Sequence, residues 1–216
     1  MNVQLASQLS KSFGTKIPIS SFQIYPNVEE YVDFLLEKID LNPSEEEFIE
    51  ENTIYKDTFL DESIALNALA YNAQSDWQNI FLTGVTGFSG AFMLQELIEN
   101  TYATIYCLVR ASNKNLALKR IEDNLKKQGL WKDEYRNRIV PLAGDLARPR
   151  LGLVKDVFDK LAEEIDVIFH IGFLVNWVYN YSDVRDANIL GTKELFKLAT
   201  QSKIKALHFS SSIATF

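Results

Sequence analysis

The strongest constraint on the fold is an alternation that begins at residue 78 and runs to residue 216. Short apolar runs, typical of buried strands, alternate with longer segments that have the period of an amphipathic helix. The apolar runs are 80–82, 103–110, 138–144, 166–172 and 205–211, and the helical segments are 91–100, 115–129, 155–165 and 186–202. Such alternation predicts a parallel sheet with right-handed crossovers. We therefore predict an α/β fold with about five strands, an incomplete form of a doubly wound sheet, which usually has about six or more.

The first 40 residues have a different pattern. Val3, Leu5 and Leu9 share one helical face, and a second helix is predicted to start near Asn27. Residues 41–77 are acidic and irregular at first, which predicts a linker with a short helix around Ile64–Tyr71. The domain prediction is therefore a small helical piece at 1–40, a linker at 41–77 and the α/β domain at 78–216.

Composition excludes several classes of protein. The net charge is −7 with the two signs mixed, which argues against a nucleic-acid partner. No apolar run reaches the length of a membrane span, and the N-terminus has no signal-peptide pattern. The single cysteine, Cys107, falls in a predicted buried strand and suits a reducing compartment. We predict a cytoplasmic protein without a membrane or nucleic-acid partner, and no Cys/His set predicts a metal site.

The first predicted strand runs directly into the glycine-rich stretch TGVTGFSG. Gly84, Gly87 and Gly90 follow the strand and open a helix, which is the setting of a dinucleotide-binding turn. Gly84 would allow the sharp turn, Gly87 the approach of a pyrophosphate, and Gly90 the close packing of helix on strand. The helix N-terminus supplies free N–H groups for the phosphate. The prediction is an NAD(P)-binding, Rossmann-like fold.

The end of the second strand predicts which cofactor binds. Folds that prefer NAD carry Asp or Glu there to bind the ribose 2′-hydroxyl, whereas arginine suits a 2′-phosphate. This strand ends at Arg110, and Arg120 is available ten residues further on as a second cation. Because a guanidinium group matches phosphate in a bidentate way, these residues favour NADPH over NADH.

Several motifs in order carry a family resemblance: TGVTGFSG, YCLVRA, PLAGDLARPRLGL, DVIFHIGFLVNW and ANILGTKEL. Over residues 78–216 the chain resembles the thioester-reductase branch of the extended short-chain dehydrogenase/reductases. These are the terminal reductase domains of nonribosomal peptide and polyketide synthases, carboxylic acid reductases and aminoadipate reductase. The resemblance implies an oxidoreductase that uses NADPH to release a carrier-bound acyl or peptidyl thioester as an aldehyde or alcohol, downstream of other synthetase modules.

The resemblance also assigns site residues. Matching cofactor-binding positions are Gly84, Thr86, Gly87, Phe88, Gly90, Arg110, Arg120, Asp145, Leu146, Gly172, Phe173, Leu174 and Asn188. Ser212 matches the catalytic Ser/Thr whose hydroxyl binds the reacting carbonyl oxygen. Phe173 departs from the family pattern, since a small residue is usual there and the ring is expected to crowd the cofactor.

Residues 2–34 resemble the latter part of an acyl or peptidyl carrier domain. In that family the corresponding helix starts at a serine that bears phosphopantetheine, and this sequence begins a few residues after that position. The resemblance therefore implies a carrier remnant without its attachment serine, placed before the reductase domain.

The family's catalytic Tyr-x-x-x-Lys pair should follow Ser212, and the 216 residues do not contain it. We interpret Tyr179 and Tyr181 as surface or loop aromatics and Lys193 as a helix-face lysine. His170 and His208 are interpreted as structural. The expectation is that this chain alone has little or no reductase activity, as a fragment of a longer enzyme would.

Two alternatives stay open. One is a nucleotide-sugar epimerase or dehydratase of the same extended superfamily, which Arg110 argues against because NAD users prefer an acid there. The other is a non-catalytic NADP-binding or interaction protein, which the missing Tyr and Lys favour.

Overall fold

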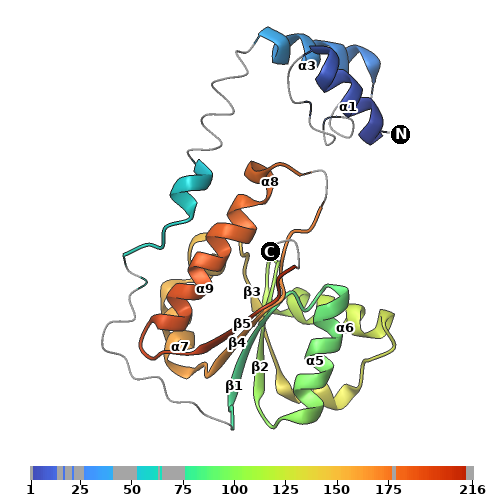
Figure 1. Ribbon diagram of the computed structural model, residues 1–216. Helices are drawn as coiled ribbons and strands as arrows, with labels where there is room; N and C mark the ends of the chain where they lie inside the picture. Colours follow the sequence, from blue (N-terminus) through green and yellow to red (C-terminus); the bar gives the residue numbers. More distant parts are fainter. Residues whose placement is uncertain are drawn as a thin grey trace. The chain divides into compact units, whose positions relative to one another are not determined.

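A computed structural model describes residues 2–13, 17, 21, 27–40, 53–62, 64, 76–176 and 179–212. The chain divides into two compact units, which are described separately (Figure 1). One unit comprises residues 1–60 and 175–185, and the other comprises residues 61–174 and 186–216. The larger unit contains the α/β domain.

The sheet of the α/β unit has five parallel strands, as the alternation predicted. They are β1 (Asn79–Thr83), β2 (Thr104–Val109), β3 (Ile139–Ala143), β4 (Val167–His170) and β5 (Ala206–Phe209). Their order is β3-β2-β1-β4-β5, so the direction of winding reverses between β1 and β4. In register, Thr83 of β1 lies opposite Leu108 of β2 on one side and His170 of β4 on the other. This order is that of a doubly wound dinucleotide-binding sheet, whose ligands bind where the winding reverses.

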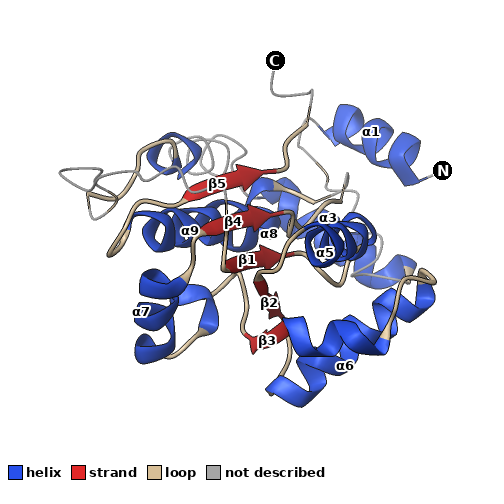
Figure 2. Ribbon diagram, turned by 90° about the horizontal axis from the view of Figure 1, so that it is seen from below, coloured by secondary structure: helices blue, strands red, loops and turns tan. Residues whose placement is uncertain are grey.

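Helices cover both faces of the sheet (Figure 2). On one face lie α5 (Phe88–Asn100) and α6 (Lys114–Lys127), and on the other lie α7 (Lys155–Glu164) and α9 (Gly191–Thr200). Each face has its own hydrophobic core. Alternate side chains of β1 show this division, because Ile80 and Leu82 enter the core under α5 and α6 while Phe81 enters the other. All three are fully buried, and this explains why the strand is apolar throughout.

The helix ends follow the sequence signals. The Asn113 side chain caps α6 by accepting the Leu116 N–H at 2.9 Å, and Lys126 and Lys127 lie in its last turn. Two short 3-10 segments, Asp133–Arg138 and Pro149–Gly152, were not predicted. In the second segment Arg150 and Leu151 have positive φ angles of 51° and 57°.

The helix predicted at 186–202 is present and ends at Thr200, but it begins with a π-helical turn. A π-helical turn, η3 (Asp186–Leu190), precedes α9, and a short helix α8 (Tyr181–Arg185) precedes that turn. The irregular turn coincides with two local constraints. The Asn188 side chain binds the Leu174 backbone, and a Cβ on Gly191 would lie 2.7 Å from the Leu146 carbonyl oxygen.

The smaller unit contains α1 (Asn2–Phe13) and α3 (Val28–Asp40), where two helices were predicted. Its core contains Ile17, Tyr31 and Leu35. The Asn27 side chain begins α3 by accepting the Glu30 N–H at 2.8 Å.

A helical turn at 53–57 lies within the predicted linker. Asp57 in this turn binds Arg185 and accepts a hydrogen bond from the Tyr181 hydroxyl at 2.8 Å. Tyr181 is therefore a bonded residue at a helix start and not a loop aromatic, and burial together with Asp57 raises its pKa to about 12. The helix predicted around Ile64–Tyr71 falls outside the described residues, apart from Ile64.

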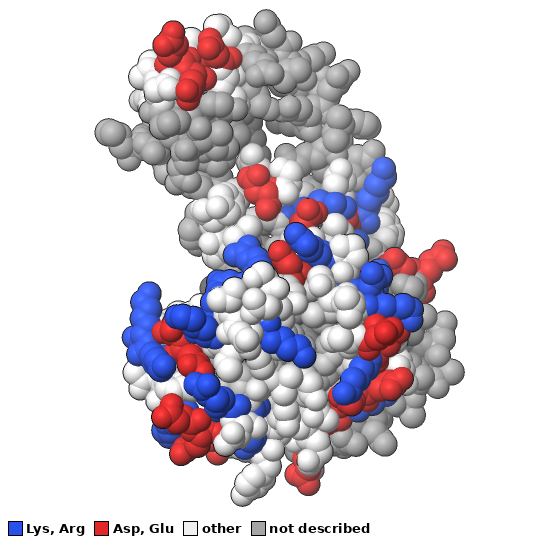
Figure 3. All heavy atoms as spheres, turned by 180° about the vertical axis from the view of Figure 1, so that it is seen from behind, with Lys and Arg blue, Asp and Glu red and all other residues white. Residues whose placement is uncertain are grey.

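Among the described residues, no helix has both the length and the apolar character needed to cross a membrane. On the face of the α/β unit seen in Figure 3, basic and acidic side chains are interspersed, as the mixed signs along the sequence predicted.

Candidate cofactor-binding site

A cavity of about 270 Å³ lies at the carboxyl ends of the strands, where the winding reverses. Its lining residues are Gly84, Thr86, Gly87, Leu108, Arg110, Gly144, Asp145, Leu146, Ile171, Gly172, Phe173, Leu174 and Ala187. They come from the end of β2, from the segments that follow β1, β2, β3 and β4, and from η3. Segments far apart in the sequence meet here because parallel strands all end at the same edge of the sheet.

The glycine turn forms one wall of this cavity. Gly84 has a φ of 78°, which favours glycine, and its carbonyl oxygen accepts the Gly87 N–H at 2.9 Å. Gly87 then precedes α5, whose N-terminus has no side-chain cap. An uncapped helix N-terminus leaves backbone N–H groups and the positive end of the helix dipole available to an anion.

The turn also packs tightly against its surroundings. A Cβ on Gly90 would overlap the Gly84 carbonyl group, so α5 approaches the turn as closely as the sequence predicted. A Cβ on Gly84 would lie 2.7 Å from the Gly172 backbone nitrogen, and one on Gly172 would lie 2.9 Å from the Gly84 nitrogen. The ends of β1 and β4 thus meet backbone to backbone.

Beside the first cavity lies a second of about 400 Å³, which shares Arg110, Gly144 and Asp145 with it. Ser112 and Arg148 also line it, and neither was identified from the sequence. In the sequence, Arg148 is only one cation in the turn after the third strand, so no pattern singled it out. In the structure its backbone N–H donates to the Asp145 carbonyl oxygen at 3.1 Å. Arg120 lines neither cavity. Its guanidinium group donates to the Arg110 backbone carbonyl oxygen.

The loop that carries Asp145 is held by the left-handed turn after it. The Asp145 N–H donates to the Leu151 carbonyl oxygen at 2.7 Å, and Leu151 is fully buried. Glu194 of α9 accepts the Arg150 N–H at 2.5 Å. These contacts hold two non-glycine residues at positive φ, a conformation that costs about 1 kcal/mol or more per residue.

Behind the cavity wall lies a buried polar group at the ends of β1 and β4. The His170 Nδ1 atom lies 2.7 Å from the Thr83 hydroxyl, and its Nε2 atom lies 3.2 Å from the Thr192 hydroxyl of α9. Both Thr83 and His170 are fully buried. Burial lowers the pKa of His170 to about 4, so its ring is neutral at physiological pH. His170 is therefore a packed polar residue of the domain interior, as the sequence predicted.

Most of the predicted cofactor residues line the first cavity: Gly84, Thr86, Gly87, Arg110, Asp145, Leu146, Gly172, Phe173 and Leu174. The others, Phe88, Gly90, Arg120 and Asn188, do not. The Phe88 side chain is mostly exposed and packs on Phe92, with ring centroids 5.0 Å apart. Asn188 accepts the Leu174 N–H at 2.8 Å and donates to the Leu174 carbonyl at 3.0 Å. The predicted catalytic Ser212 follows the end of β5, at the same edge of the sheet, outside the cavity lining.

The Phe173 ring, which was expected to crowd the cofactor, has aromatic partners. Its centroid lies 4.3 Å from that of His170 and 5.0 Å from that of Phe209. The other histidine, His208, stacks on Phe169 at 4.6 Å. Cys107 is fully buried, and burial raises the pKa of its thiol, so it is a core residue. Within the described part of the chain, no group of His, Cys, Asp and Glu is arranged to hold a metal ion.

The parallel sheet, its winding reversal and the glycine turn at that point define a Rossmann-like nicotinamide-dinucleotide-binding domain. The family described as male sterility protein, an NAD-binding family, matches residues 82–216, and the chain belongs to it.

The relatives include proteins named as synthases, synthetases and reductases. One of the subunits of linear gramicidin synthase from Brevibacillus parabrevis is 49% identical over 142 residues, which are 66% of this chain and 3% of that protein. Glycine betaine reductase ATRR of Emericella nidulans is 36% identical over 213 residues, 96% of this chain and 17% of that protein. Among solved structures, the terminal R domain from the myxalamid PKS-NRPS biosynthetic pathway superposes with a TM-score of 0.73 at 44% identity. That match covers 76% of this chain and 42% of the solved chain, so this chain spans less than half of the domain that it resembles.

Proposed function

We propose that this chain is the cofactor-binding part of an NADPH-dependent thioester reductase. In this proposal the whole protein reduces a carrier-bound acyl or peptidyl thioester and releases it as an aldehyde or alcohol. The observation that carries it is the cavity between the glycine turn and the β4 end, in a chain 44% identical to a terminal reductase domain. When bound, the nicotinamide cofactor supplies the hydride for such a reduction.

The preference for NADPH rests on the second cavity. Arg110 and Arg148 line it together with Ser112, and this set suits the 2′-phosphate that distinguishes NADPH from NADH. Asp145 is the one acid in the same lining, and its carboxylate already accepts the Ala147 N–H at 3.0 Å. The glycine turn and the N-terminus of α5 would bind the pyrophosphate. Gly172, Phe173 and Leu174 would lie along the ribose and nicotinamide.

We assign the substrate side of the site to the segment after β5. The Ser212 hydroxyl is proposed to donate a hydrogen bond to the reacting carbonyl oxygen, where negative charge develops during reduction. Because β5 lies beside β4 in the parallel sheet, this segment starts from the strand edge that carries the cofactor cavity.

Residues 1–40, which form the N-terminal part of the smaller unit, are proposed to be part of an acyl or peptidyl carrier domain, whose phosphopantetheine arm would hold the substrate. Supporting this assignment, the similarity to the glycine betaine reductase extends over 96% of the chain and so reaches the N-terminal helices. The proposed layout is a carrier remnant at 1–40, a linker at 41–77 and the reductase portion at 78–216.

Cofactor titration tests the central proposal. NADPH and NADH are titrated separately into the protein, and binding is followed by calorimetry. We expect NADPH to bind at least about tenfold more tightly, since each charged hydrogen bond to the 2′-phosphate contributes about 1.5–3 kcal/mol. Tighter binding of NADH would favour an epimerase-like relative, and no binding of either would contradict the assignment. Incubation with NADPH and an acyl-phosphopantetheine thioester, with mass spectrometry for the aldehyde, tests the reaction.

A further inference from the structure

The buried His170 has no role in the proposed chemistry, yet its ring joins three elements of the site. It lies at the end of β4, with β1 on one side and α9 on the other. The ring contacts two hydroxyl groups, those of Thr83 and Thr192, through its two nitrogen atoms. The direction of each of these hydrogen bonds follows from counting donors and acceptors.

The Thr83 hydroxyl oxygen already accepts two hydrogen bonds. The Ile171 N–H donates to it at 3.2 Å, and the Gly172 N–H donates to it at 3.1 Å. A hydroxyl group has two acceptor sites and one proton, so the Thr83 proton is left for the third contact. Thr83 therefore donates to His170 Nδ1, and that nitrogen carries no proton.

A neutral imidazole with an unprotonated Nδ1 carries its proton on Nε2. Nε2 therefore donates to the Thr192 hydroxyl oxygen at 3.2 Å. The Thr192 hydroxyl in turn donates to the Asn188 carbonyl oxygen at 2.6 Å. Asn188 then binds both the N–H and the carbonyl of Leu174 through its side chain.

This series of hydrogen bonds, from Thr83 through His170 and Thr192 to Asn188, thus begins and ends on the same wall of the cofactor cavity. Thr83 fixes the backbone of Gly172, and Asn188 fixes the backbone of Leu174. The residue between them, Phe173, packs its ring on the imidazole itself. All three residues of this wall, Gly172–Leu174, line the cavity.

We propose that His170 is a positioning residue: as the neutral Nε2–H tautomer it connects Thr83 to Thr192 and so holds Gly172–Leu174 in place to bind the cofactor. The inference rests on the proposed function in one respect, namely that this wall contacts a nicotinamide cofactor.

The other protonation states of His170 conflict with the contacts. A proton on Nδ1 would point at a hydroxyl whose two acceptor sites are occupied, and the ring would compete with the Ile171 or Gly172 N–H. The rings of Phe173 and Phe209 pack on the imidazole at 4.3 and 5.6 Å, and apolar surroundings disfavour the charged form. The low pKa that burial gives His170 agrees with this arrangement.

The tautomer is tested by NMR without any cofactor. The sequence has two histidines, so the His208→Phe variant leaves His170 as the single imidazole. Long-range ¹H–¹⁵N correlation at neutral pH should show a protonated Nε2 and an unprotonated Nδ1. A protonated Nδ1, or a charged ring, would overturn the proposal. His208 stacks on Phe169 outside the cavity lining, so this variant should bind NADPH as the unchanged protein does.

The positioning role is tested by NADPH affinity. Thr192→Val keeps the shape of the side chain, leaves His170 packed and removes the acceptor of the Nε2 proton. We expect it to weaken NADPH binding by roughly five- to tenfold, corresponding to about one hydrogen bond. Thr192→Ser keeps the hydroxyl, so it should bind NADPH more tightly than Thr192→Val. His170→Phe removes both bonds and should weaken binding further.

The outcomes separate this inference from the proposed function. Equal NADPH affinity in folded Thr192→Val, Thr192→Ser and unchanged protein would overturn the positioning role while leaving the cofactor assignment intact. A fall in thermal stability without a change in affinity would likewise show that the chain of bonds is only structural. Failure of the unchanged protein to bind NADPH would overturn the proposed function, and with it the role of this wall in cofactor binding.

Discussion

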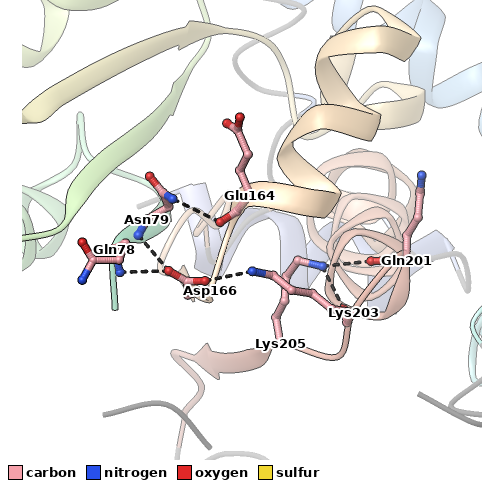
Figure 4. A network of polar contacts seen from close by, with 7 residues as sticks. All are labelled: Gln78, Asn79, Glu164, Asp166, Gln201, Lys203 and Lys205. Atoms are coloured by element: carbon pink, nitrogen blue, oxygen red, sulfur yellow. Dashed lines mark hydrogen bonds and ion pairs between the residues drawn. The ribbon is translucent and has the colours of Figure 1, made fainter. Parts of the chain in front are cut away.

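Asp166 accepts a hydrogen bond from Lys203 Nζ at 2.8 Å, and this pair joins the start of β4 to the connection between α9 and β5 (Figure 4). The other carboxylate oxygen of Asp166 accepts the backbone N–H groups of Gln78 and Asn79 at 2.9 and 3.0 Å. One carboxylate therefore holds together the beginnings of β1, β4 and β5, at the sheet edge opposite the cofactor cavity. The Asp166 side chain is only 9% exposed.

Asp166→Ala should lower the free energy of unfolding by about 2–3 kcal/mol, because it removes the acceptor for three donors at a largely buried position. The measurement is urea denaturation at neutral pH. Asp123→Ala is the matched control, since Asp123 pairs with Lys119 on the exposed face of α6 and should cost less than about 0.5 kcal/mol. Equal losses in the two variants would contradict the role given to Asp166.

The same carboxylate predicts a pH dependence. Burial alone would raise the pKa of Asp166, but the hydrogen bonds from Lys203, Asn79 and Gln78 outweigh it and lower the pKa below the ordinary value of 3.8. Stabilisation by Asp166 should be fully present above that value and lost as the pH falls through the lower folded-state pKa. The difference in unfolding free energy between the unchanged protein and Asp166→Ala should therefore shrink on acidification.

Arg110→Ala and Arg148→Ala should each weaken NADPH binding by roughly tenfold to a hundredfold, the loss expected for a charge-assisted hydrogen bond to phosphate. NADH affinity should change little, because NADH has no 2′-phosphate. Calorimetric titration of both cofactors gives the comparison. Arg136→Ala is the control, since Arg136 is half exposed and pairs with Glu122 away from the cavity. A parallel loss for both cofactors would show that these arginines do not read the 2′-phosphate.

Gly90→Ala should disturb the phosphate-binding turn, because its Cβ would overlap the Gly84 carbonyl group. We expect a loss of roughly 1–3 kcal/mol in stability from this overpacking, together with weaker NADPH binding. Gly129→Ala is the control, because it introduces backbone strain without any overlap between atoms. Gly129 has a φ of 71° with open space around it, so its substitution should cost about 1 kcal/mol and leave NADPH affinity unaltered. Normal NADPH affinity in Gly90→Ala would refute the need for close packing at the turn.

Lys205 should make stability rise with pH on the alkaline side. Burial, aided by the nearby charge of Lys203, lowers the pKa of Lys205 from 10.5 to about 8. Between these values the unfolded chain binds more protons than the folded protein, so the unfolding free energy contributed by Lys205 increases with pH. Lys205→Met should remove this rise, as measured by urea denaturation at several alkaline pH values. Lys127→Met, at an exposed position of α6, should keep it.

The structure also shows why Lys205 tolerates burial. Its ammonium group donates to the carbonyl oxygens of Gln201 and Lys203, both at 2.9 Å, just after the end of α9 (Figure 4). A cation at a helix C-terminus is favoured by the helix dipole.

The periodicity of the sequence determined the five strands and the four main helices, because each strand and helix must bury its own apolar face. The glycine spacing determined the turn after β1, since only glycine fits the close contacts at Gly84 and Gly90. Arg110 could be identified as a cofactor residue because it follows β2, the strand after the one that carries the glycine turn, and β2 lies next to β1 in the sheet.

The tertiary structure decided which residues that lie far apart in the sequence come into contact. Thr83 meets His170, 87 residues further along the chain, only because β4 lies next to β1. Arg148 and Arg110 line the same cavity because β2 and β3 are neighbours. Asp166 binds the start of β1, as His170 binds its end, because β4 lies next to β1. Local patterns fix which residues form strands, whereas the order and register of those strands fix which polar side chains share a site.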